Sequence, residues 1–207
     1  MTPIKVLHVT DVEVDDYHLK NLSDYLKESI VEFSFVTLGS SDSALVRGMN
    51  KRGRKAFGLN SVGRRSYPRV VKSLARLFKE LDSDIVHTNL FDPSLIGLTI
   101  AKVQGRKTFL TRHHSDAVHK IASPLKRKFY LALDNYISRK ADHIIAPSQM
   151  VRDILVEDEK VPSEKVTIIP YAQTTERFDP VTPTAVSAKR TELRMDEQLA
   201  LVCVSRL

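Results

Sequence analysis

The sequence predicts an α/β fold with a Rossmann-like, doubly wound parallel sheet that is covered by helices on both faces. Two observations indicate this class. Short apolar runs such as IKVLHV (residues 4–9) and FSFVTL (residues 33–38) are nearly continuous, as strands buried on both faces are. Segments whose apolar residues repeat at helical spacing separate these runs, and strands alternating with helices favour a parallel sheet.

The first part of the chain should contain strands at residues 4–9, 33–38 and 85–87. A helix between the first two strands is predicted from apolar residues near helical spacing, namely Tyr17, Leu19, Leu22, Leu26 and Ile30. A second helix over residues 70–81 is predicted from one apolar face, formed by Val70, Val71, Leu74, Leu77, Phe78 and Leu81. This order begins a β-α-β alternation.

The alternation continues to Pro170. A helix over residues 93–104 is expected to start with Asp92 as N-cap and Pro93 at the first helical position. A strand at 109–111 follows, and Ser123 and Pro124 then repeat the same start. The helix after them carries Leu125, Phe129, Leu133 and Ile137 on one face. A strand at 143–146, a helix at 148–157 and a strand at 166–169 complete the series.

The end of the chain differs in character from the rest. Residues 173–184 are polar and contain proline, as linkers do, and residues 185–195 predict a short helix. Residues 199–204 then resemble one more buried strand. We therefore expect a Rossmann-like domain over 1–172, a linker with a short helix over 173–198, and at 199–207 the first strand of a missing second domain.

Composition excludes several classes of protein. The 207 residues are 42% hydrophobic and 28% charged, and no apolar run is long enough to span a membrane. The N-terminus lacks the features of a secretory signal, so we expect a cytoplasmic location, with peripheral attachment to the inner membrane face as an option. The single cysteine, Cys203, lies in an apolar run and is expected to be a core residue.

Positive charge is concentrated between Lys51 and Arg69, where seven basic residues occur without an acidic one. Lys126, Arg127 and Lys128 add cations to the first turn of a predicted helix, which is unfavourable by a few tenths of a kcal/mol each. We expect an anionic acceptor or membrane surface to bind Arg52, Arg54, Arg64, Arg65, Lys126 and Arg127. A solvated loop is the alternative. Nucleic acid is not expected, because no motif for base readout accompanies the charge.

The predicted sheet also predicts where a site should lie, because ligands bind beyond the carboxyl ends of parallel strands. The residues at those ends include Asp11, Asn89, Ser148, Tyr171 and the TRHHSD segment at 111–116. A metal site built from His113, His114, Asp116 and His119 is not expected, since adjacent histidines on a strand point to opposite sides and nothing completes a tetrahedral set. Histidines that only bond loop backbone remain an alternative to a cleft role.

Several other enzyme classes lack their motifs here. The sequence contains no G-x-G-x-x-G fingerprint, no P-loop and no G-x-S-x-G elbow. Dinucleotide-dependent dehydrogenases, P-loop nucleotide hydrolases and serine hydrolases of the α/β type are therefore not expected.

Five segments resemble, in order and spacing, the N-terminal half of family 4 glycosyltransferases with the GT-B fold. They are DIVHTN (84–89), TFLTRHHSD (108–116), KADHIIAPSQMV (140–151), KVTIIPYAQTTERFDP (165–180) and LALVCVSRL (199–207). Such enzymes are similar in plan: two Rossmann-like domains, of which the first holds the acceptor and the second the nucleotide-sugar. They retain the anomeric configuration and usually need no metal, so no cofactor is expected.

The resemblance also implies roles for single residues. His113 matches the histidine that faces the transferred sugar, and Arg206 matches an arginine that holds the donor diphosphate. Substrate contacts are expected from Asp11, Asn89, Arg112, His114, Ser148 and Tyr171. Two segments depart from the family pattern: DVEVDDYH after the first strand has no glycine pair, and Tyr171 is followed by Ala172 and Gln173 where glycine and an apolar residue are usual.

The resemblance thus implies a retaining transferase that moves a hexose from a nucleotide-sugar to a carbohydrate or lipid-linked acceptor, in glycan or glycolipid synthesis for the cell envelope. The family's phosphate-binding lysine and Glu-x7-Glu segment would lie beyond Leu207. Since catalysis needs both walls of the cleft, the chain alone should be inactive. The competing hypothesis is a non-enzymatic Rossmann-like module that binds a phosphorylated ligand or a protein partner.

Overall fold

The computed structural model describes residues 2–25, 30–113, 121–172, 181–195 and 199. The chain divides into two compact units, residues 1–172 and residues 173–207. The first unit contains the sheet and, apart from Arg206, the site residues discussed below. The predicted strand at 199–204, Cys203 and Arg206 lie outside the described residues, apart from Leu199, so their roles stay predictions.

Seven parallel strands form one sheet in the order β3-β2-β1-β4-β5-β6-β7. The strands are β1 (Ile4–Thr10), β2 (Val31–Thr37), β3 (Lys55–Gly58), β4 (Ile85–Asn89), β5 (Lys107–Thr111), β6 (His143–Ala146) and β7 (Val166–Ile168). The chain builds outward from β1 to β3 and then returns to the other side of β1. The doubly wound parallel sheet predicted from the sequence is confirmed, with its topological switch point between β1 and β4.

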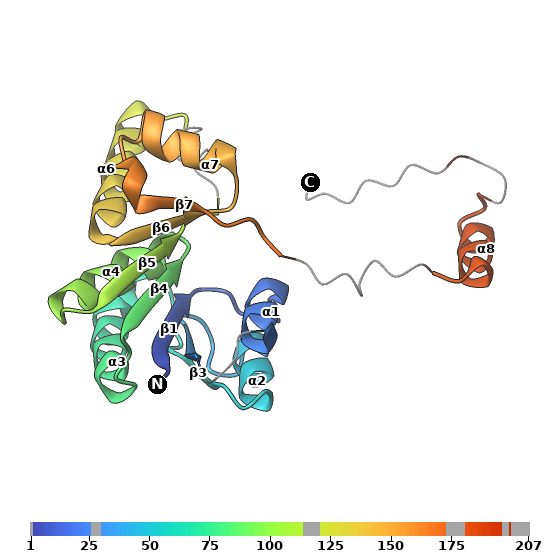
Figure 1. Ribbon diagram of the computed structural model, residues 1–207, viewed down its shortest axis with the longest axis horizontal. Coiled ribbons are helices and arrows are strands. Elements are labelled where there is room, and N and C mark those ends of the chain that lie inside the picture. The colour runs from blue at the N-terminus through green and yellow to red at the C-terminus, as the bar shows by residue number, and fades with distance from the viewer. Residues whose placement is uncertain (1, 26–29, 114–120, 173–180, 196–198, 200–207) are drawn as a thin grey trace. The chain divides into compact units, whose positions relative to one another are not determined.

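Helices cover the sheet in two groups (Figure 1). α1 (Tyr17–Tyr25) and α2 (Ala44–Lys51) lie against one face, and α3 (Tyr67–Glu80), α4 (Phe91–Val103) and α6 (Pro124–Lys140) lie against the other. α7 (Gln149–Asp153) continues into a π-helical turn at Ile154–Asp158, and short 3₁₀ turns occur at Arg64–Ser66 and Ser163–Lys165. The second unit contains α8 (Pro183–Glu192), which Thr182 caps.

Three apolar clusters hold these layers together. Leu7 and Val86 pack with Phe78 of α3, while Phe35 packs with Met49 of α2 on the opposite face. The third cluster joins α4 and α6 to β5 and β6. Because a large side chain that becomes fully buried contributes about 1.5–3 kcal/mol, these clusters fix the register of the strands and the position of each strand end.

The structure corrects three details of the sequence prediction. α4 begins at Phe91, after Leu90 in the left-handed region (φ 69°), so Asp92 lies in the first turn rather than at the N-cap. The strand β3 occupies part of the segment that was expected to be a basic loop. Leu125 and Phe129 lie on the predicted apolar face of α6, but their exposed fractions are 81% and 58%.

Candidate functional site

The carboxyl ends of the strands bring the predicted site residues to one edge of the sheet. Asp11 follows β1, Asn89 ends β4, and His113 follows β5 by two residues. Tyr171 lies three residues beyond β7. This edge includes the switch point between β1 and β4, where open α/β sheets bind their ligands.

His113 and Tyr171 are directly paired at this edge. The Tyr171 hydroxyl is hydrogen-bonded to Nδ1 of His113, and the two rings are nearly parallel at 9°, with centroids 5.8 Å apart. His18 of α1 meets the Tyr171 ring edge-on at 5.2 Å. Sequence reasoning missed His18, because it lies inside a helix pattern and belongs to no motif.

The direction of the Tyr171 hydrogen bond depends on the tautomer of His113. Burial, together with the nearby Asp16 carboxylate, raises the pKa of Tyr171, so its hydroxyl keeps its proton at neutral pH and can donate. When that hydroxyl donates to Nδ1, the proton of the neutral imidazole is on Nε2. His113 then presents an N–H donor from Nε2, which suits a sugar hydroxyl or a developing negative charge.

The side chain of Asn89 is buried beneath the carboxyl ends of the strands rather than exposed to solvent. The residue is 5% exposed, and its Nδ2 lies 2.8 Å from Nε2 of His8, which is itself 1% exposed. The His8 ring meets the ring of His87 edge-on at 4.8 Å, and Nε2 of His87 lies 2.7 Å from the Thr111 hydroxyl. The amide nitrogen of Asn89 thus makes a buried hydrogen bond that supports the strand end, and its predicted substrate contact stays a prediction.

The two core histidines are held in their neutral form. Burial is the main cause that lowers the pKa of His8 well below its usual value, and the neighbouring imidazole of His87 adds to it. Burial likewise lowers the pKa of His87 from 6.5 to about 4, with smaller effects from His18 and His113. A charged imidazole in this cluster would face three other imidazoles, so protonation opposes folding.

We expect the stability of the fold to decrease as the pH falls from 6.5 to about 4. The folded-state pKa of His87 lies below the unfolded one, so the unfolded chain binds the proton first, at a cost of about 2–3 kcal/mol for His87 alone. Urea unfolding at neutral pH and at about pH 4.5 measures this loss. His87→Gln should flatten the dependence, whereas the control His143→Gln on the same sheet face should not; equal slopes in both variants would contradict the assignment.

Arg112 also points inward, although the sequence suggested a cleft residue. Its side chain is 9% exposed, with Nη2 2.8 Å from Glu159 and Nη1 3.4 Å from Asp134. Both carboxylates are buried as well. Arg112 therefore ties the end of β5 to α6 and to the segment after α7, and its predicted substrate contact stays a prediction.

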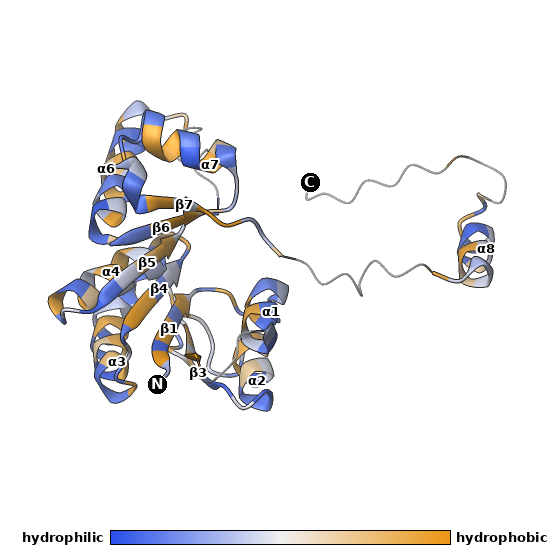
Figure 2. Ribbon diagram, viewed as in Figure 1, coloured by the Kyte–Doolittle hydropathy of each residue, from blue (hydrophilic) through white to orange (hydrophobic). Residues whose placement is uncertain are grey.

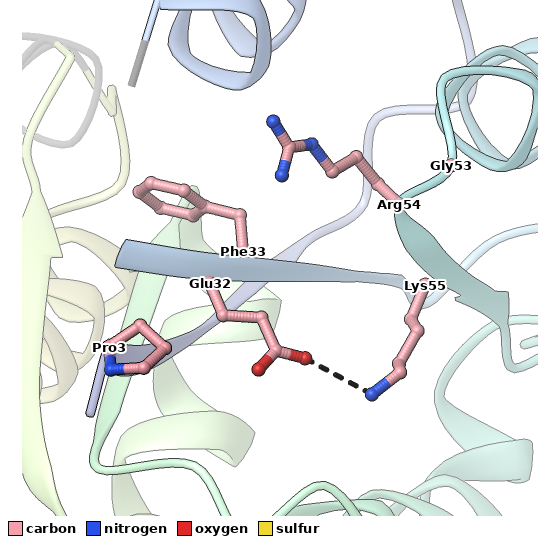
Figure 3. A pocket seen from close by; sticks show the side chains of 6 residues that line it. All are labelled: Pro3, Glu32, Phe33, Gly53, Arg54 and Lys55. Carbon is pink, nitrogen blue, oxygen red and sulfur yellow. Dashed lines mark hydrogen bonds and ion pairs between the residues drawn. The ribbon is translucent and has the colours of Figure 1, made fainter. Parts of the chain in front are cut away.

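The cationic segment Lys51–Arg69 is divided between the two edges of the sheet. Before β3, Arg52 lies 3.6 Å from Asp24 and 3.9 Å from Asp15, and Arg54 donates to the backbone and side chain of Ser23. A hollow of about 230 Å³ opens here, and Figure 3 shows Lys55 reaching Glu32 (3.1 Å) while Arg54 points away from that pair. Arg52 and Arg54 thus contact α1 and the residues before it at the amino ends of the strands, and their predicted role toward an anionic acceptor or membrane stays a prediction.

After β3 the chain reaches the carboxyl edge, where the cations have other neighbours. Arg64 donates to the Tyr130 hydroxyl of α6 at 3.3 Å, which places the 3₁₀ turn beside that helix. The carboxyl group of Asp11 lies at the same edge. Its partial burial raises its pKa, and the negative charge of Asp92 raises the pKa further. Arg64 and Arg65 therefore belong with Lys126 and Arg127 of α6, apart from Arg52 and Arg54.

The remaining predicted residues are placed as follows. Ser148 is exposed and caps α7 by accepting from the Val151 amide at 3.3 Å. His114, Asp116 and His119 lie outside the described residues. Within the described ranges, no group of three His, Cys, Asp or Glu side chains is arranged to hold a metal ion.

Comparison with solved structures defines the class of this protein. The chain is similar to a glycosyltransferase from Rickettsia africae (19% identity, TM-score 0.68), with 94% of this chain matching 50% of that one. It is also similar to the HepE protein of Anabaena in complex with UDP (13% identity, TM-score 0.71, 93% of this chain and 50% of that one) and to MurG of Acinetobacter baumannii (11%, 0.56, 87% and 50%). The fold is the Rossmann-like fold of one half of a GT-B glycosyltransferase.

The family follows from the sequence match. Residues 16–177 match Glycosyltransferase Family 4, and the chain belongs to this family. It spans about half the length of the solved structures that it resembles. No curated protein matches the chain. Among the helices that the structure describes, none combines the length and the apolar character that crossing a membrane requires.

Proposed function

We propose that this chain is the acceptor-side half of a retaining glycosyltransferase that moves a hexose from a nucleotide-sugar to a carbohydrate or lipid-linked acceptor. The observation that carries the proposal is the His113–Tyr171 pair, which lies at the carboxyl edge of the sheet in a family 4 chain. The proposal extends to synthesis of glycans or glycolipids of the cell envelope, at the cytoplasmic face of the membrane.

In this proposal His113 acts as a neutral hydrogen-bond donor. Its Nε2–H would bind a hydroxyl of the transferred sugar or stabilise charge that develops on the donor, while Tyr171 holds Nδ1 and fixes the orientation of the ring. Asp11 and Ser148 at the same edge are the remaining acceptor contacts that we propose. His114 stays a proposed substrate contact from the sequence alone.

A second half would supply the donor site. The Anabaena structures to which this chain is similar contain UDP or UDP-glucose, which supports a uridine-linked sugar as the first donor to test. Arg206 is proposed to hold the donor diphosphate as a bidentate cation. No metal or other cofactor is part of the proposal. Because the reacting groups come from both walls of a cleft, we propose that residues 1–207 alone do not turn over substrate.

A donor screen tests this function. The 207-residue chain and the protein encoded with any sequence that continues after Leu207 are each incubated with UDP-glucose and related nucleotide-sugars, and released nucleotide is measured. We expect sugar-dependent release from the longer protein and none from the shorter one. If the longer protein binds nucleotide-sugars but never releases nucleotide, with or without glycan acceptors, the transferase proposal fails.

One feature favours the alternative, a non-enzymatic binding module. The loop after β1 is tied to the start of α2: the Glu13 carboxylate accepts from the Ser40 amide, and the Glu13 carbonyl accepts from Leu45 at 3.1 Å. The Glu13 side chain also fills the space in which a side chain at Gly39 would lie. This loop is packed by its own residues and lacks the glycine pair of the family, so nucleotide-sugar binding without transfer would support the module.

A further inference from the structure

The outer surface of α3, α4 and α6 contains an open apolar groove of about 440 Å³. Its lining is almost entirely hydrocarbon and comes from Val71, Leu95, Ile96, Thr99, Ile100, Leu133 and Tyr136. Val71 and Tyr136 remain 40% and 38% exposed. Surfaces of this kind on a soluble domain commonly mark a site of contact with another molecule.

The groove continues along α6 as an exposed apolar stripe. Leu125, Phe129, Leu133 and Tyr136 are spaced by four, four and three residues, which places them on one side of the helix. Leu125 and Phe129 at the N-terminal end are the most exposed of them. Figure 2 shows hydrophobic residues interspersed with hydrophilic ones along α6.

Cations surround the exposed end of the stripe. Arg64 reaches the Tyr130 hydroxyl, so the 3₁₀ turn with Arg64 and Arg65 lies beside the first turns of α6, which carry Lys126, Arg127 and Lys128. Within the described part of the chain, no carboxylate forms an ion pair with Arg65 or with these three α6 residues. Val62, next to this turn, is 81% exposed. Exposed apolar side chains therefore lie beside a cluster of cations, of which Arg64 also interacts with the Asp92 carboxylate.

We propose that this surface, the α6 stripe with its cationic rim, docks on an anionic lipid bilayer. Cations contact acidic headgroups while Leu125, Phe129 and Val62 enter the boundary between headgroups and acyl chains, as the apolar side of an interfacial helix does. The unfavourable cations at the start of α6 then gain an anionic neighbour. The inference names the membrane partner of the proposed transferase, but it requires neither a sugar donor nor an acceptor.

A second copy of the chain fits this surface less well than a bilayer. A two-fold contact is self-complementary, so it would bring the same cationic rims of both copies together. Like charges across an interface oppose association, and they would oppose it most at low salt. A bilayer that contains acidic lipid offers hydrocarbon to the apolar stripe and negative charge to the cations beside it.

Vesicle sedimentation tests the proposal with the 207-residue chain. Binding to phosphatidylcholine vesicles is compared with binding to vesicles that also contain phosphatidylserine, at about 0.1 M and about 0.5 M salt. We expect strong binding only with phosphatidylserine and at the lower salt concentration. Each cation near an acidic surface contributes about fivefold, so the double variant Arg65→Gln/Lys126→Gln should bind about 25-fold more weakly.

Matched variants separate the surface from general effects. Leu125→Ser/Phe129→Ser should weaken binding to acidic vesicles about tenfold or more. Val103→Ser changes a side chain that is 84% exposed at the end of α4, and Lys107→Gln changes an exposed cation at the start of β5. Both controls should leave binding unchanged.

Three results would overturn the inference. They are equal binding to neutral vesicles, equal losses in the control variants, and a concentration-dependent dimer in sedimentation velocity that Phe129→Ser abolishes. The last result would assign the surface to a second copy. Transfer to a water-soluble acceptor is measured without vesicles, so the two proposals are tested independently. A negative vesicle result does not contradict the proposed transferase activity, and a failed transfer assay does not contradict membrane binding by this surface.

Discussion

Arg112→Ala should destabilise the fold by about 3–5 kcal/mol, because it removes the guanidinium that pairs with the buried carboxylates of Asp134 and Glu159. The guanidinium lies 2.8 Å from Glu159 and 3.4 Å from Asp134, and all three side chains are at least nine-tenths buried. Removing one partner of a buried ion pair costs far more than the pair contributes, since the remaining charge has lost its water as well as its partner.

Urea unfolding of the variant and of the parent chain measures this difference. Arg76→Ala is the matched control: its side chain is 75% exposed and pairs with Glu80 four residues later, so its loss should cost about 0.3–0.5 kcal/mol. A variant with Arg112→Met, Asp134→Asn and Glu159→Gln should recover much of the stability, since it leaves no buried charge. If Arg112→Ala behaves like Arg76→Ala, the guanidinium is free for substrate after all.

Apolar patterning was sufficient to predict most of the fold. The runs at 4–9, 33–38 and 143–146 are continuous because both faces of each strand are buried, and alternation with helices then implies parallel pairing. β3 was missed because it is only four residues long and lies among arginines, and its position depends on pairing with β2 from Ser34 onward. A strand so short is specified by its neighbour rather than by its own sequence.

The location of the site followed from topology, but the direction of each side chain did not. Residues after parallel strands must meet at one edge, so Asn89, Arg112 and Tyr171 were all found there in advance. Whether such a residue faces the crevice depends on partners that are remote in sequence. Asn89 turns to His8, 81 residues away, and Arg112 turns to Glu159, 47 residues away.

Helical periodicity has a similar limit on α6. It grouped Leu125, Phe129, Leu133 and Ile137 on one face, but it could not show what covers each residue. Ile137 is 2% exposed because the C-terminal half of α6 packs on the sheet, whereas Leu125 and Phe129 extend past the described core. The exposed end of this face is therefore a property of the tertiary structure.

In a protein with both halves of the cleft, we expect His113→Ala to lower kcat for sugar transfer by about 10²–10³-fold. The loss of a preorganised donor beside the transferred sugar is the physical reason. The measurement is steady-state transfer from a nucleotide-sugar, with circular dichroism to confirm that the variant folds. His143→Gln is the control, because His143 bonds the Thr167 hydroxyl at 2.8 Å on the sheet face, away from the pair. Transfer at the parent rate by His113→Ala would remove His113 from the cleft.

Tyr171→Phe tests the positioning role separately from the chemistry. The phenyl ring keeps the stacking on His113 and the edge-on contact with His18 but removes the hydroxyl that is hydrogen-bonded to Nδ1, so the imidazole can then carry its proton on either nitrogen. We expect kcat to fall about tenfold with little change in KM, since only the fraction of enzyme with Nε2–H remains competent. If kcat falls only in proportion to the loss of stability, Tyr171 has a structural role alone. A selective loss of kcat would instead mean that the hydroxyl contributes by fixing the tautomer of His113.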